Sequence, residues 1–346
     1  MKKEKIIVLL ILFTSLLVTV NVHAKKLAVL NDYYKDPFLI VDNDQFYVWD
    51  RALRKVYIYY RENFKKVAEF GKRGEGPGEF TGISWVSINE DFIFVSSYPK
   101  ICIFDKKGNF KKQVKGPTNA GAFKPFGNNY VGVSYPYTDP YDKECEMLFG
   151  LFNSNLKKKK DIYLAKTHRA TWPGERKENV LWIRGCTKAV PYKDKLVIGS
   201  TYKGFYFAVF DLQGDMLCEI NRNYEKRKVT EDVKSKRINE HRRITGEQEW
   251  KKHKMMYNIV FSEYFPAYTN FVVDDNKIYV FLFPKDGTEE VLILDLKGKL
   301  LKKVYFTAMN SSIIDWGRFS IRDGKLLYVD ENFDEETWEL HEIDLN

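Results

Sequence analysis

The chain has 346 residues, of which 44% are apolar and 16% aromatic, and its formal charge is +9. A chain of this length does not need a disulfide framework to build its core. The basic charge suits an anionic partner or surface, although a solvated basic surface explains it as well. The chain contains no nucleic-acid recognition motif, so we expect no nucleic-acid partner.

The first 24 residues have the three parts of a secretory signal peptide. A basic start at residues 1–5 precedes an apolar stretch from Ile6 to Val20, and Val22-His23-Ala24 suits a cut after Ala24. We therefore predict cleavage there and export to the periplasm or the outside of the cell, with no transmembrane span left. The alternative is an uncleaved membrane anchor, for which this apolar stretch is slightly short.

Residues 25–346 are dominated by short runs of Val, Ile, Tyr and Phe, which Asp, Asn, Gly and Lys separate. This pattern is typical of many short strands. Several runs are apolar at consecutive positions, such as residues 205–210 and 278–283, which indicates strands covered on both faces. We expect each sheet to stand between two neighbouring sheets.

Two turn signals repeat along this region. The sequence Asp-x-x-Gly follows an apolar run at Asp105, Asp211 and Asp295, where Asp caps its own turn and Gly takes a positive φ. A second signal occurs about two strands before each unit's last turn, at residues 42–44, 89–91, 127–129, 193–194, 274–276 and 323–324. Six such signals predict six units of four strands, the blades of a β-propeller.

The predicted blades span residues 36–70, 82–116, 122–166, 187–222, 267–306 and 314–345. The last of them has only three strands, and one strand, Lys26–Leu30, is left over at the other end of the chain. Pairing the two closes the ring and removes an exposed edge. A β-sandwich is the alternative, but repeated units with the same turn chemistry favour an all-β, six-bladed propeller.

In such blades the tight turns lie at one end of the strands and the longer connectors at the other. Nearly all extra sequence falls in the longer connectors, at residues 71–81, 135–145, 166–186, 223–266 and 331–337. Loops carry function on rigid scaffolds, so we place the candidate site on this loop-rich face, around the central channel.

The connector at about 223–263 is predicted to be helical. Thr230 is its expected N-cap, and Thr245–Gln248 fits a capping box. A helical face that we expect to pack on the ring contains Trp250, His253, Tyr257 and Val260. The remainder is rich in Lys and Arg, which fits either a cationic lid for an anionic ligand or a solvated helix pair.

The candidate binding residues are polar and aromatic residues of the loop-rich face, the types that anchor interfaces. They are Arg73, Glu75, Tyr137, Tyr141, His168, Arg169, Trp172, Trp182, Arg184, Arg242, Arg243, Trp316 and Arg318.

Catalytic motifs are absent: the chain has no G-x-S-x-G, H-E-x-x-H, Walker loop or C-x-x-C. We therefore favour a non-enzymatic role over an enzymatic one, and expect no cofactor. A divalent metal in the central channel stays open, because carboxylates from several blades leave no local spacing. The candidates for it are Asp139, Asp142, Glu263, Glu331 and Asp334.

Four cysteines, at positions 102, 145, 186 and 218, permit disulfides in an oxidising compartment without requiring them. Cys102 lies in an apolar run and is expected to be buried. If any pair forms, we expect Cys145 with Cys186, because both lie beside connectors of the same face.

The segment Gly71–Phe80, with the sequence GKRGEGPGEF, resembles the interblade loop of NHL-type and TolB-like six-bladed propellers, and especially exported bacterial proteins of that group. The resemblance implies a tight connector whose Phe80 fills the space between two blades. It also implies a monomeric binding propeller that engages a protein, a peptide or an anionic glycan of the cell envelope. A minority of such propellers are hydrolases or lyases (lactonases among them) with a central metal, and this is the alternative.

Overall fold

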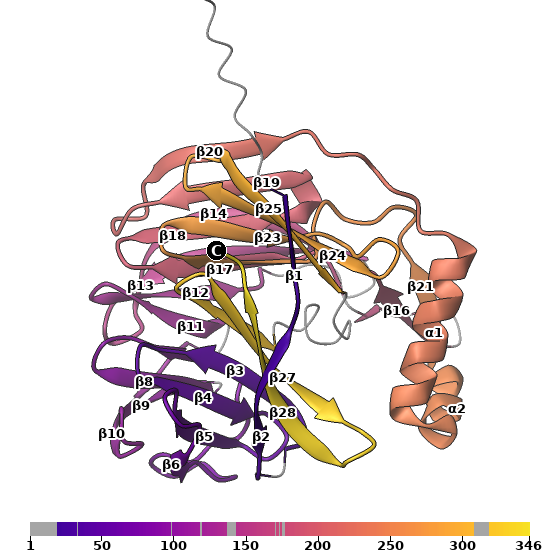
Figure 1. Ribbon diagram of the computed structural model, residues 1–346. Helices are drawn as coiled ribbons and strands as arrows, with labels where there is room; N and C mark the ends of the chain where they lie inside the picture. Colours follow the sequence, from indigo (N-terminus) through magenta and orange to yellow (C-terminus); the bar gives the residue numbers. More distant parts are fainter. Residues whose placement is uncertain are drawn as a thin grey trace, which may run out of the picture.

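The computed structural model describes residues 19–32, 34–97, 99–117, 120–136, 143–169, 171–172, 174, 177–307 and 318–346. Six sheets of antiparallel strands stand around a common axis and form a six-bladed β-propeller (Figure 1). The predicted fold class is therefore confirmed.

The first three blades follow the predicted order of four strands each. Blade one contains β3 (Pro37–Val41), β4 (Gln45–Asp50), β5 (Lys55–Tyr60) and β6 (Lys66–Phe70). Blade two contains β7 (Trp85–Ile88), β8 (Phe92–Ser97), β9 (Lys100–Asp105) and β10 (Phe110–Lys115). Blade three contains β11 (Ala120–Phe126), β12 (Asn129–Ser134), β13 (Glu144–Phe152) and β14 (Lys158–His168).

The last three blades complete the ring. Blade four contains β17 (Thr187–Tyr192), β18 (Lys195–Ser200), the short 3-10 helix η1 (Thr201–Lys203), β19 (Phe205–Phe210) and β20 (Met216–Arg222). Blade five contains β22 (Asn270–Asp274), β23 (Lys277–Phe281), β24 (Thr288–Asp295) and β25 (Leu300–Thr307). Blade six contains β26 (Phe319–Arg322), β27 (Lys325–Asn332) and β28 (Thr337–Asp344).

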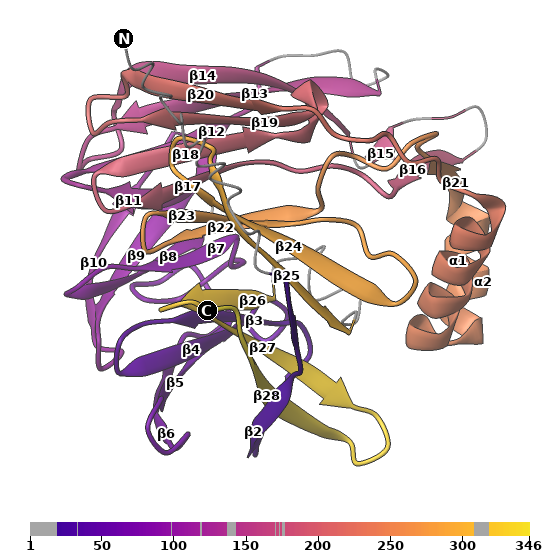
Figure 2. The same ribbon diagram turned by 45° about the horizontal axis from the view of Figure 1, so that its top comes forward.

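The ring closes as the sequence predicts. Strand β2 (Lys25–Leu30) pairs antiparallel with β28, with Lys26 opposite His341 and Leu30 opposite Trp338. Figures 1 and 2 show this indigo strand beside the yellow end of the chain. The last blade thus obtains its fourth strand from the start of the ring.

One further strand, β1 (Thr19–Val22), pairs in parallel with β25 at the outer edge of blade five. Val22 packs against the apolar cluster between blades five and six. This strand lies within the segment predicted to be removed, so a cut after Ala24 leaves blade five with four strands.

The apolar core lies between neighbouring blades, in six clusters that follow one another around the ring. Every residue of β19 is buried, because blades three and five cover both faces of its sheet. Phe80 is fully buried in the cluster between blades one and two, where the ring of Phe104 lies 5.9 Å away, so its predicted interblade role is confirmed. Consecutive apolar residues in a strand therefore do indicate a sheet between two sheets.

Two connectors combine into a small unit beside the ring, which we call the connector module. It contains β15 (Thr171–Trp172), β16 (Glu178–Trp182), α1 (Glu231–Thr245), α2 (Glu247–Met256) and β21 (Tyr257–Phe261). Strand β16 comes from the connector between blades three and four and pairs in parallel with β21 from the next connector. In both views the helices project to one side of the ring (Figures 1 and 2).

The helix boundaries correct two predictions and confirm a third. Thr230 caps α1, because its hydroxyl accepts a hydrogen bond from the Val233 amide. The prediction of a capping box at Thr245 is wrong. The Thr245 hydroxyl donates to the His241 carbonyl, and Gly246 is the N-cap of α2. The predicted helical face is also wrong beyond Met256, because pairing with β16 makes the following residues a strand.

The four cysteines are free thiols, so the condition for the pairing of Cys145 with Cys186 is not met. Cys145 lies in the β13–β14 ladder of blade three, whereas Cys186 lies at the entry to blade four. Cys102 is fully buried, as predicted. Within the described ranges, no helix is long and apolar enough to cross a lipid bilayer.

Candidate functional site

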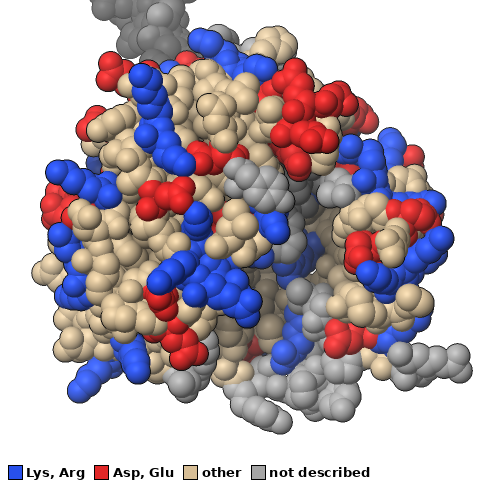
Figure 3. Space-filling model, turned by 90° about the horizontal axis from the view of Figure 1, so that it is seen from below, with Lys and Arg blue, Asp and Glu red and all other residues tan. Residues whose placement is uncertain are grey.

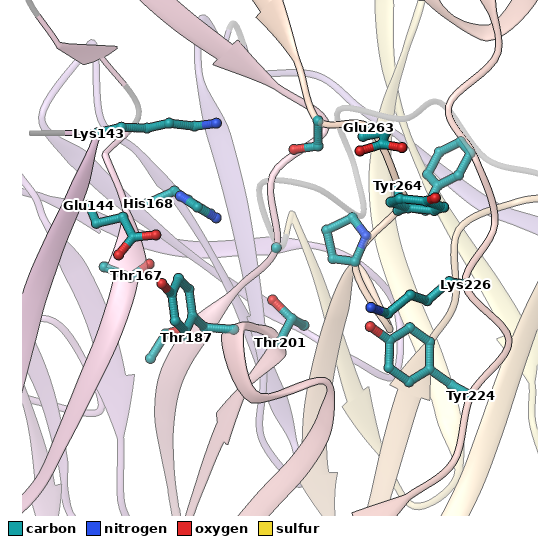
Figure 4. A pocket seen from close by; sticks show the side chains of 15 residues that line it. Lys143, Glu144, Thr167, His168, Thr187, Thr201, Tyr224, Lys226, Glu263 and Tyr264 are labelled. Atoms are coloured by element: carbon teal, nitrogen blue, oxygen red, sulfur yellow. The ribbon is translucent and has the colours of Figure 1, made fainter.

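A cavity of about 510 Å³ opens on the loop-rich face, between blades three and four and the base of the connector module. Figure 4 shows Lys143, Glu144 and His168 on one side, and Tyr224, Lys226, Glu263 and Tyr264 on the other. The remaining lining residues are Thr167, Gly185, Thr187, Thr201, Tyr202, Ser262, Phe265 and Pro266.

The walls are built from strand ends and from the two chain segments that lead to the module. Lys143 and Glu144 lie where β13 begins, and His168 is the last residue of β14. On the other side, the segments around residues 228 and 264 pair like a short antiparallel ladder: the Val229 amide donates to the Glu263 carbonyl (2.9 Å). The cavity is therefore held by backbone hydrogen bonds on both sides.

The cavity floor contains a tight turn in blade four. The Thr201 amide donates to the Cys186 carbonyl (3.0 Å), and Gly204 ends the turn with φ of 88°. A positive φ of this kind favours glycine. The turn directs Thr201 and Tyr202 towards the cavity.

Burial and polar interactions within the wall shift the pKa values of two side chains. A hydrogen bond to the Glu144 carboxylate raises the pKa of Tyr202 to about 12. Burial, together with the charge of Lys143, lowers the pKa of His168, whose ring lies 5.3 Å from that of Tyr202. At neutral pH this wall therefore presents a neutral imidazole and a protonated phenol. Among the described residues, buried Nδ1 of His168 has no hydrogen-bond partner.

The predicted candidate residues are not gathered in one place. His168 lines the cavity, the Arg169 amide donates to the Lys143 carbonyl (2.8 Å), and Arg184 precedes the lining residue Gly185. Tyr137, Tyr141 and Trp316 lie outside the described residues, as does the side chain of Trp172.

Two candidates lie in the loop between blades one and two. Arg73 forms a β-bridge with Phe80, and the Glu75 carbonyl accepts a hydrogen bond from the Lys100 ammonium (3.0 Å). In blade six, Arg318 pairs with Asp36 at 2.6 Å. None of the three lines the cavity.

The remaining candidates belong to the connector module. Trp182 packs in its aromatic core with His241, Trp250, His253 and Phe261.

The cations of the connector module are mostly paired within the helices. Arg242 pairs with Glu247, and the other pairs join Lys234 to Glu231, Lys236 to Asp232 and Lys252 to Glu249. Arg243 lies over the Phe333 ring of blade six, 5.5 Å from its centroid. These pairings fit solvated helices better than a cationic lid.

The sequence prediction missed most of the cavity wall, including Lys143, Glu144, Tyr202, Tyr224 and Lys226. One signal in the sequence could have identified most of them. Lys143, Glu144, Tyr224 and Lys226 lie in a connector already assigned to the loop-rich face, close to a strand end, whereas Tyr202 lies in the short turn between β18 and β19. Residues close to the ends of the long connectors are thus better candidates for a binding site than residues chosen by type alone.

Metal-ligand geometry is absent from the described part of the chain, where no three His, Cys, Asp or Glu side chains gather so that they could hold an ion. Glu263 lines the cavity, and Glu331 lies near the end of β27. Asp334 follows in the β27–β28 hairpin, while Asp139 and Asp142 lie outside the described residues.

Comparison with known proteins identifies the class of fold. No family model matches the chain. No curated protein matches it. Among solved structures, a candidate exported protein from Bacteroides fragilis is similar over 95% of this chain and 100% of its own, with 10% sequence identity and a TM-score of 0.51.

Two weaker similarities involve other propellers. Hsv2 from Kluyveromyces lactis is 13% identical, with 88% of this chain and 97% of that chain covered and a TM-score of 0.38. The β-propeller domain of the Trilobed protease from Pyrococcus furiosus is 11% identical. The similarity covers 90% of this chain and 78% of that chain, with a TM-score of 0.44. At 10% identity, the similarity to the Bacteroides fragilis protein shows the fold alone.

Proposed function

We propose that this protein is an exported, non-enzymatic binding propeller, which engages a protein, a peptide or an anionic glycan of the cell envelope through its loop-rich face. The observation that carries the proposal is the cavity between blades three and four, of about 510 Å³. Its volume falls in the range of ordinary ligand sites, and backbone hydrogen bonds hold both of its walls.

The chemistry of the wall suits a polar, anionic chain. Lys143 and Lys226 lie on opposite sides, so a chain that carries carboxylate or sulfate groups can meet an ammonium at either wall (Figure 4). Hydroxyl groups of Thr and Tyr residues supply both hydrogen-bond donors and acceptors, and the tyrosine rings offer flat apolar faces. Glu144 and Glu263 add acceptors that discriminate between ligands by repelling misplaced anionic groups.

Export rests on the N-terminal signal pattern, and the similar fold of the candidate exported Bacteroides protein agrees with it. A metal-dependent hydrolase or lyase would need a ligand cluster, and no observation in the described residues favours one.

The test is binding of the purified protein to an array that carries oligouronates, sulfated oligosaccharides, acidic peptides and their neutral counterparts. We expect anionic probes to bind and the variant Lys226→Glu to lose binding at least about tenfold, because the reversed charge repels them. The matched control is Lys297→Glu, which reverses the charge of an exposed lysine in the β24–β25 turn at the opposite end of the blades.

A second variant, Thr187→Trp, fills the cavity without changing charge and is expected to abolish binding of every probe. Binding that survives both cavity variants would contradict the proposal. Equal losses in Lys226→Glu and Lys297→Glu would also contradict it, since they would show attraction to the whole basic surface.

A further inference from the structure

The central channel contains two lysines that have no role in the cavity. Lys124 lies on β11 and Lys188 on β17, the first strands of blades three and four. The first strands of neighbouring blades contact one another around the axis. Both side chains are largely surrounded by protein yet keep partial solvent exposure.

The contacts of Lys124 place its ammonium at the axis. It lies 4.2 Å from the centroid of the Trp85 ring, on the first strand of blade two, and donates to the Ala189 carbonyl of blade four at 2.8 Å. Blades two and four are not neighbours in the ring. A side chain of blade three can contact both of these blades only near the axis, where the first strands of all blades come close together.

Lys188 continues the same line of contacts towards blade five. Its ammonium donates to the side-chain oxygen of Asn270 on β22 and lies 4.8 Å from the centroid of the Phe271 ring. The two amines are therefore held by carbonyl oxygens and aromatic faces, which are neutral groups.

Neither amine has a carboxylate partner among the residues that the structure describes, although ion pairs are common elsewhere on this protein. A cation removed from water without a counter-ion costs free energy, and the amine releases its proton more readily. Burial, with the charge of Lys188 adding to it, lowers the pKa of Lys124 to about 7. Burial also lowers the pKa of Lys188 to about 8.

Among the described residues, Cys186 is a further titratable group beside the pair. Burial raises its pKa to about 12, so it remains a neutral thiol. Among the described residues beside the pair, the charge therefore comes from the two lysines: it is positive when they are protonated and zero when they are not.

We propose that Lys124 and Lys188 form an oxyanion-binding site inside the central channel, where blades three, four and five meet, and that it takes a small carboxylate or phosphate. The anion supplies the negative charge that no described residue provides beside the two lysines. Each ammonium has three N–H donors, and its hydrogen bond to the protein uses one of them, so the others can donate to the anion.

This site is separate from the cavity on the loop-rich face. Thr187 and Lys188 are consecutive residues of β17, so their side chains project to opposite faces of the strand. Thr187 lines the cavity and Lys188 faces blade five.

The experiment measures the unfolding temperature in inorganic phosphate, in succinate and in chloride at equal ionic strength, at about pH 6.5 and about pH 9. At the lower pH we expect phosphate, succinate or both to raise the unfolding temperature above its value in chloride. A larger increase of the unfolding temperature in phosphate indicates a phosphate site, and a larger increase in succinate indicates a carboxylate site. At the higher pH both amines are mostly neutral, so we expect the dissociation constant to rise at least about tenfold.

The decisive variant is the double substitution Lys124→Met and Lys188→Met, with Lys297→Met as the matched surface control. General salt effects on stability act equally on all variants. We expect the double variant to lose the oxyanion-specific rise and the control to keep it. An equal rise in the double variant, or no rise in the unsubstituted protein, would overturn the proposal.

Two further outcomes bear on the site. In chloride, Lys124→Met should unfold at or above the temperature of the unsubstituted protein, because methionine replaces an uncompensated buried cation. A clear decrease would show that the lysine is already compensated. Loss of the rise in Lys226→Met, with retention in the double variant, would place the anion in the cavity and overturn the channel assignment.

Discussion

Leu30 and Trp338 lie directly opposite each other on β2 and β28, and this pair joins the first strand of the ring to its last blade. Leu30 is 4% exposed and packs in the cluster between blades six and one. Its neighbour Val29 is 42% exposed on the other side of the strand. We therefore expect Leu30 to contribute much more to the free energy of unfolding than its neighbour Val29.

We expect Leu30→Ala to lower the free energy of unfolding by about 2–5 kcal/mol, because it leaves a cavity at the closure. Val29→Ala is the control and should cost less than about 1 kcal/mol. Equilibrium denaturation in urea measures both. Similar effects of the two substitutions would argue against closure by β2.

A second prediction concerns Gly71, at the start of the loop between blades one and two. Its φ is 94°, and an added Cβ would lie 2.4 Å from the Phe80 ring and 2.8 Å from the Arg54 carbonyl. We expect Gly71→Ala to destabilise the protein by about 1–3 kcal/mol. Gly82→Ala is the control, since nothing lies within 4 Å of its Cβ position. Thermal unfolding of the two variants checks the difference.

The connector module should loosen in acid. Burial lowers the pKa of His253, and burial with the nearby charge of His253 lowers that of His241, both from a usual 6.5. Their rings lie 5.2 Å apart. The unfolded state therefore binds protons at higher pH than the folded one, and the stability from the neutral rings, complete above about pH 6.5, declines as the pH falls below it.

Hydrogen exchange of residues 231–261 at about pH 7.5 and about pH 5, corrected for intrinsic rates, measures this loosening. His253→Phe keeps an aromatic ring beside Trp250 and should reduce the pH dependence. Unchanged protection between the two pH values would contradict the prediction.

The N-terminus provides a fourth prediction. If the signal is cut after Ala24, the intact mass of the exported protein corresponds to a chain that begins at Lys25, and β1 is lost. The outer edge of β25 then has no partner strand, so its amides should exchange faster than in a variant whose cleavage is blocked. A mass that includes residues 19–22 would instead show that β1 stays on blade five.

Much of the fold could be predicted because its signals are local. In the turn at Asp105, the carboxylate accepts from the Lys107 and Asn109 amides, and Gly108 has φ of 85°, as the repeat predicts. The helical face was predicted wrongly beyond Met256 for the opposite reason. Strand pairing with a segment about 80 positions earlier overrode the local helical pattern there.

The candidate site was only partly predictable. His168 was selected by residue type and does line the cavity, but Trp182, selected in the same way, packs in the module's core. Residue type does not distinguish an aromatic ring that binds a ligand from one that fills a core. The neighbouring side chains decide between them, and these come from other parts of the chain.

The sequence by itself determined the number of blades, the strand that closes the ring and the face that carries the long connectors, because turn chemistry and strand alternation act between residues a few positions apart. Tertiary structure alone decided the cavity, the connector module and the amine pair in the channel. Each of these brings together side chains from distant parts of the chain, such as Lys143 with Lys226 and Lys124 with Trp85. Their proximity is set by how six sheets pack around one axis, which no short stretch of sequence encodes.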